Sequence, residues 1–167
     1  MQNLFEILKS RILVFDGAMG TMIQQYKFSE SDYRGERFKD FQNSVKGNYD
    51  LLSLTQPEEI STIHKKYLET GADIIETNTF SGTTIAMADY QMENLVYELN
   101  YESAKIAREV ADEFTKEILT KGYKLEDINL KESDRFVVEI EYQTRQPVNA
   151  DGERCFEFPV VTRIRDT

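Results

Sequence analysis

The sequence is poor in cysteine, histidine and positive charge, and each shortage excludes a class of function. Among 167 residues there is one cysteine, Cys155, and one histidine, His64. A single cysteine excludes an internal disulfide framework and favours a cytoplasmic protein. The sequence contains 20 Lys and Arg residues and 30 Asp and Glu residues, which gives a formal net charge of −10. This charge argues against a nucleic acid or a membrane surface as partner, because both are polyanions.

Long apolar runs are also missing. No window approaches the roughly 18 apolar residues of a membrane span. Residues 1–11 carry Glu6, Lys9 and Arg11 among apolar residues at helical spacing, so they predict a short helix and not a secretory signal. Hydrophobic residues still make up 40% of the chain, enough for a soluble domain with its own core.

The apolar pattern that is present predicts an α/β fold. Residues 12–15 and 72–77 are short apolar runs typical of buried parallel strands. Between these runs, Pro57 in a first turn and Gly71 at a C-terminal exit predict a helix that ends near Thr70. A strand, a helix and a strand in this order form a right-handed crossover that makes the two strands parallel.

Three further features complete the predicted elements. Thr55 and Glu58 have the spacing of a capping box for the helix that contains Pro57. Residues 24–48 lack clean periodicity and predict a long excursion with short helical turns, whereas residues 94–119 have the 3.6-residue period of a long amphipathic helix.

Polar residues follow both predicted strands, where an α/β sheet binds its ligands. After the first strand, small residues permit close backbone approach, and Asp16 supplies a carboxylate for an ammonium group. The two candidate loops are Asp16, Gly17, Ala18, Met19, Gly20 and Thr21, and then Glu76, Thr77, Asn78, Thr79 and Phe80. The same residues also suit a structural role, because Asp-Gly is a common turn pair and Glu-Thr-Asn-Thr can bond to its own backbone.

Other catalytic arrangements are not favoured. His64 has no neighbouring cysteine or acidic cluster in the sequence, so a surface or packing role is the better interpretation. Cys155 has no second thiol to share a zinc ion. No phosphate-binding glycine loop and no Ser-His-Asp arrangement is present.

Several stretches together resemble one known family. Residues 12–21, 33–38, 50–57 and 71–80, extended by residues 83–90, are similar to the start of the homocysteine-binding (homocysteine S-methyltransferase) domain of cobalamin-dependent methionine synthases. The similarity covers residues 4–114. It implies the start of an incomplete (β/α)8 barrel of the TIM type, which binds homocysteine through its strand-end loops.

The resemblance also assigns individual residues. Carried over position by position, it places Asp16, Gly17, Ala18, Met19, Gly20, Thr21, Glu76, Asn78 and Thr79 in the homocysteine pocket. In the family, three cysteines from later strands hold a zinc ion that activates the homocysteine thiol, and methylcobalamin donates the methyl group. None of these cysteines can be mapped here. The resemblance therefore implies a methyltransferase segment for methionine biosynthesis that is inactive alone and holds neither zinc nor cobalamin.

The remainder of the chain resembles no family and shows a different pattern. We expect residues 1–119 to form the partial barrel and residues 120–167 to form a β-hairpin-rich tail, in which residues 136–142 pair with residues 156–164. The third barrel strand of the family is not recognisable. A truncated or rearranged gene product is expected, whose open edges are covered by a missing barrel half on another chain or by self-association. The alternative is a noncatalytic small-molecule-binding or interaction domain.

Overall fold

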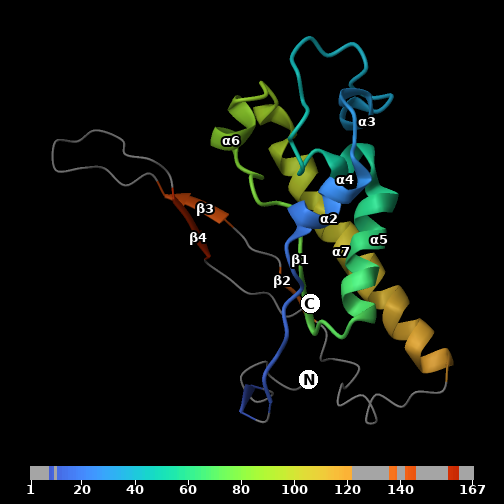
Figure 1. Ribbon diagram of the computed structural model, residues 1–167. Helices are drawn as coiled ribbons and strands as arrows, with labels where there is room; N and C mark the ends of the chain where they lie inside the picture. The colour runs from blue at the N-terminus through green and yellow to red at the C-terminus, as the bar shows by residue number, and fades with distance from the viewer. Residues whose placement is uncertain (1–7, 10, 122–135, 139–141, 146–157, 162–167) are drawn as a thin grey trace.

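The computed structural model describes residues 8–9, 11–121, 136–138, 142–145 and 158–161 (Figure 1). Helices dominate it, and the short strands make the architecture a helix-rich α/β arrangement. In chain order the elements are α2 (Met19–Tyr26), α3 (Glu30–Arg34), α4 (Leu52–Thr55), α5 (Pro57–Glu69), β1 (Ile74–Glu76), α6 (Thr84–Ala88), η1 (Glu93–Leu95), α7 (Val96–Thr120), β2 (Phe136–Val138), β3 (Tyr142–Arg145) and β4 (Phe158–Val161).

The core is centred on α5 and α7, which lie side by side (Figure 1). Ile63 and Leu68 on α5 are buried, as are Leu99 and Ile106 on α7, so both helices bury the apolar face predicted from the sequence. Each such side chain contributes about 1.5–3 kcal/mol when it is fully buried. Among the described residues, no helix combines the length and the apolarity needed to cross a membrane.

The ends of α5 confirm two predictions and correct one. Pro57 occupies the first turn, and Gly71 has a φ of +98°, the left-handed conformation expected just after the helix. The predicted cap by Thr55 is wrong, because Thr55 is the last residue of α4 and its hydroxyl donates to the Leu51 carbonyl at 3.4 Å. Gln56 takes the N-cap position without a side-chain cap. Thr55 cannot cap α5 because the short helix α4, which the sequence pattern did not reveal, ends at this residue.

The strands around β1 are parallel, as predicted. β1 pairs with β2 in the register Ile74 to Phe136, and an isolated parallel bridge joins Ile74 to Phe15. The prediction that residues 12–15 are buried is wrong, because the side chain of Ile12 is 86% exposed and that of Phe15 is 53% exposed. Parallel strands are buried only where both faces are covered, and the described elements do not cover this segment on both faces.

The end of the chain differs from the prediction at its first strand. Residues 136–138 form β2, which pairs in parallel with β1, whereas the antiparallel pair is formed by β3 with β4, so residues 136–138 are not part of the predicted hairpin. An antiparallel pair is present, but residues 142–145 lie opposite residues 158–161, where residues 136–142 were expected. β2 is a further parallel strand after the long helix, in a segment where no third barrel strand was recognisable from the sequence. Most of the predicted opening helix lies outside the described residues, as do the ends of the predicted strand 156–164.

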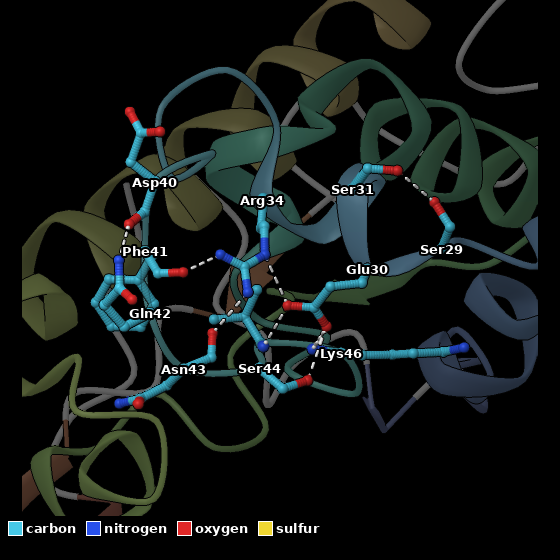
Figure 2. Close-up of polar contacts among 11 residues, drawn as sticks. Ser29, Glu30, Ser31, Arg34, Asp40, Phe41, Gln42, Asn43, Ser44 and Lys46 are labelled. Atoms are coloured by element: carbon cyan, nitrogen blue, oxygen red, sulfur yellow. Dashed lines mark hydrogen bonds and ion pairs between the residues drawn. The ribbon is translucent and has the colours of Figure 1, made fainter.

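The excursion after α2 is fastened by two charged side chains, Glu30 and Arg34, which we call the Glu30–Arg34 clasp (Figure 2). The Arg34 Nε donates to Glu30 at 2.9 Å, and its two terminal nitrogens donate to the carbonyls of Phe41 and Asn43. Glu30 also accepts hydrogen bonds from three consecutive groups, which are the Ser44 hydroxyl and the backbone N–H groups of Val45 and Lys46. The clasp therefore fixes the chain just before Gly47.

Candidate functional site

A cavity of about 790 Å³ lies at the carboxyl end of β1. Three segments that are far apart in the sequence line it, together with a tyrosine that follows α6. The lining residues are Asp16, Gly17, Ala18, Met19, Gly20, Gly47, Asn48, Tyr49, Asp50, Glu76, Thr77, Asn78, Thr79, Phe80, Ser81 and Tyr90. The cavity is large enough for a small molecule.

The first predicted loop lines the cavity with all of its residues except Thr21. Thr21 is exposed and lies in the first turn of α2. Met19 and Gly20 also belong to that turn, so the predicted loop is shorter than expected and leads directly into a helix N-terminus. The first N–H groups of a helix have no partner within the helix and are suited to bind an anion.

Close packing explains the glycine at position 17. A Cβ atom there would lie 2.9 Å from the Tyr67 hydroxyl oxygen of α5. The same hydroxyl donates to the Ala18 carbonyl at 3.4 Å, so the Tyr67 side chain packs against the loop and is hydrogen-bonded to it. A side chain at position 17 would displace this support.

Asp16 is the most unusual group of the first loop. Its Oδ2 accepts a hydrogen bond from the Glu76 backbone N–H at 3.1 Å, whereas its Oδ1 is buried and accepts none among the described residues. Burial, and to a lesser extent the nearby Glu76 carboxylate, raises the pKa of Asp16 to about 6. A buried oxygen without a donor, beside a second negative charge, favours a cationic ligand group.

The second predicted loop divides into an exposed carboxylate and a buried polar cluster. Glu76 is exposed, whereas the side chains of Asn78 and Thr79 are 4% and 7% exposed. The Asn78 amide nitrogen donates to the Tyr49 carbonyl at 2.8 Å and to the Ser53 hydroxyl at 3.2 Å. The Thr79 hydroxyl shares a hydrogen bond of 2.7 Å with the Thr77 hydroxyl. Much of the polar capacity of this loop is thus used within the protein.

Sequence reasoning missed the third wall of the cavity, which comes from residues 47–50. Asp50 is 3% exposed, and burial raises its pKa to about 6 although the backbone N–H groups of Ser81 and Phe80 act in the opposite direction. Tyr90 was missed as well, and burial, with the Asp89 and Asp50 charges, raises its pKa. The available signal was a run of polar residues directly before the helical segment that starts at Leu52.

The metal-binding side chains among the described residues do not form a metal centre. No group of three or more His, Cys, Asp and Glu side chains comes together there. His64 is fully buried, both of its ring nitrogens lack a hydrogen-bond partner in the described part of the chain, and burial lowers its pKa to about 4. It is therefore a packing residue, as the sequence favoured.

The chain matches a family model over most of its length. Residues 13–138, well over half of the chain, match the model of the family described as homocysteine S-methyltransferase. The match includes all three walls of the cavity and extends to β2, so it continues beyond the limit at residue 114 inferred from the sequence.

Proposed function

Because the chain belongs to the homocysteine S-methyltransferase family, we propose that the cavity beyond β1 binds homocysteine. The observation that carries the proposal is the carboxylate of Asp16, a residue that lines the cavity and whose buried Oδ1 atom has no donor among the described residues. An α-amino acid carries an ammonium group, which can donate the hydrogen bond that this carboxylate lacks. Both the family match and this unsatisfied acceptor support the same ligand class.

The two charged groups of an amino acid suit two sides of the cavity. The ammonium group would pair with Asp16, with the Glu76 carboxylate adding a second negative charge nearby. The carboxylate would accept hydrogen bonds from the free N–H groups at the start of α2, where Met19 and Gly20 lie. Gly17, Ala18 and Thr21 would shape this end, and Asn78 and Thr79 would form the opposite wall.

The proposed reaction class is methyl transfer of the methionine synthase type, from methylcobalamin to homocysteine, on the start of a (β/α)8 barrel. Zinc supplies thiol activation in that type through three cysteine thiolates. The residues present do not fit such a centre, because the sequence holds one cysteine and the described residues hold no cluster of metal ligands. We therefore propose that this chain by itself binds homocysteine without activating its thiol.

A noncatalytic small-molecule-binding or interaction domain is the second candidate. The pairing of β2 with β1 favours it, because part of the tail then belongs to the same sheet as the cavity. The division at residue 119, a second chain that supplies further strands, self-association and a cytoplasmic location all stay predictions.

Isothermal titration of the purified chain with homocysteine, in the presence of zinc, tests the proposal. We expect saturable heat from the unchanged protein, a loss of at least about tenfold in affinity for Asp16→Ala, and no change for the exposed control Asp40→Ala. Methionine and norleucine serve as comparison ligands, since both keep the α-amino acid groups but lack the thiol. Absence of heat from a folded sample would refute homocysteine binding by this chain.

A further inference from the structure

The loop that follows β1 is held by residues 49–53, part of which lines the same cavity. The Ser81 backbone N–H donates to Asp50 Oδ2 at 2.6 Å, and the backbone N–H of Phe80 donates to the same carboxylate. The Asn78 side chain reaches this segment as well, at the Tyr49 carbonyl and the Ser53 hydroxyl. These contacts join residues that are 25 to 31 positions apart in the sequence.

Asp50 is the charged member of this connection. Its side chain is 3% exposed, and no Lys or Arg side chain is among the residues that line the cavity. A buried carboxylate without a counter-ion is costly, and hydrogen bonds from backbone N–H groups are what stabilises its charged form here. The carboxylate and the two amides therefore depend on each other.

We infer that Asp50 is a positioning residue of the cavity, which holds the turn at Phe80 and Ser81 so that Glu76 and Phe80 stay at the binding site. Its oxygens are used for backbone amides and not for the ligand. Its effect on homocysteine rests on the proposed function, whereas its effect on the loop does not. An asparagine at this position keeps the size but offers one acceptor oxygen in place of two.

Site-resolved amide hydrogen exchange on Asp50→Asn tests the inference. We expect exchange at Phe80 and Ser81 to become at least about tenfold faster, while amides in the centres of α5 and α7 exchange as before. The matched control Asp40→Asn, which changes an exposed aspartate, should leave all of these amides unchanged. A residue that acts only on global stability would accelerate the core amides too, and that outcome would overturn the inference.

A homocysteine titration of the same variants separates the two proposals. Asp50→Asn should bind several-fold more weakly than the unchanged chain, together with the faster exchange of the loop. Weaker binding with unchanged exchange would make Asp50 a direct ligand and overturn the positioning role. If the unchanged chain does not bind homocysteine, the proposed function fails, and the exchange data still decide the role of Asp50.

A measurement on the unchanged protein keeps the inference testable if Asp50→Asn does not fold. The Ser81 amide donates to a carboxylate at 2.6 Å, so it should be protected at least about tenfold relative to an unstructured peptide. A Ser81 amide that exchanges at the unstructured rate would overturn the positioning role without any substitution.

Discussion

Asp16 and His64 both bury polar atoms that have no hydrogen-bond partner among the described residues, but their surroundings differ. Asp16 is half-buried and lines the cavity, so part of this residue can meet a ligand. His64 lies within α5 and is fully buried, so its neutral ring stays in the core. Burial raises the pKa of the acid and lowers the pKa of the base, and the two residues therefore respond to pH with opposite sign.

Homocysteine binding should weaken as the pH falls through about 6, the pKa to which burial raises Asp16. Protonated Asp16 cannot pair with an ammonium group, so we expect affinity at pH 5 to be about tenfold lower than at pH 7.5. Titration calorimetry at four pH values measures this dependence. Asp16→Asn should bind weakly at every pH, whereas Asp50→Asn should keep the part of the pH dependence that comes from Asp16. A flat profile in the unchanged chain would contradict an ammonium pair with Asp16.

The His64→Leu substitution should reduce the loss of stability in acid. Unfolded histidine binds a proton below pH 6.5, but the folded protein resists this until about pH 4, so His64 lowers the free energy of unfolding as the pH falls between these values. The full effect is about 3 kcal/mol.

Urea unfolding of both proteins at pH 7 and pH 5 checks this. Asp16 and Asp50 have raised pKa values and act with the opposite sign in the same range, and the difference between the two proteins cancels them. Equal pH slopes for both proteins would show that His64 does not titrate in this way.

At the scale of elements, the sequence predicts helix faces, which depend on the spacing of apolar residues. It does not predict caps, strand exposure or strand partners, which depend on adjacent elements. The apolar spacing of α5 and α7 was sufficient because each helix buries one regular face. The role of Thr55 was mistaken because α4 precedes it directly. The exposure of Ile12 and the partner of β2 depend on tertiary arrangement, which the local pattern of residues 12–15 or 136–142 does not contain.

The candidate site follows the same division. Residues 16–20 and 76–79 were predictable because polar residues after parallel strands meet at one edge of a sheet. Residues 47–50 line the cavity and follow directly after the chain that the Glu30–Arg34 clasp fixes. Nothing in the spacing of these residues indicates that placement.

The clasp provides a prediction for the element that it fastens. Although partial burial by itself raises the pKa of Glu30, the hydrogen bonds from Val45, Ser44, Lys46 and Arg34 together lower it. Glu30→Gln removes the charge and should cost about 1 kcal/mol of stability and speed amide exchange at Val45 and Lys46. Glu36→Gln is the matched control, because the Glu36 side chain is 96% exposed in its pair with Lys39. If the Val45 and Lys46 amides exchange at the same rate in both variants, the clasp does not fix residues 44–46.

At the scale of the whole molecule, one core connects the excursion, the helices and β1. Leu99 on α7 is fully buried in this core, and Leu99→Ala should cost about 2–5 kcal/mol of unfolding free energy. Leu119, on the same helix and 40% exposed, is the matched control and should cost less than about 1 kcal/mol. Urea titration followed by circular dichroism and by tyrosine fluorescence checks both. If the two probes disagree, the described elements do not unfold as one unit.

Phe80 stands at the edge of the cavity with 98% of its side chain exposed. The sequence contains no tryptophan, so Phe80→Trp would give the molecule one indole ring, in contact with solvent at the mouth of the cavity. Its emission would then change colour and intensity when an occupant excludes water, without background from any other indole. The same ring would permit stopped-flow observation of ligand arrival and departure. Position 80 is thus a site for a fluorescent reporter of ligand binding at the edge of the cavity.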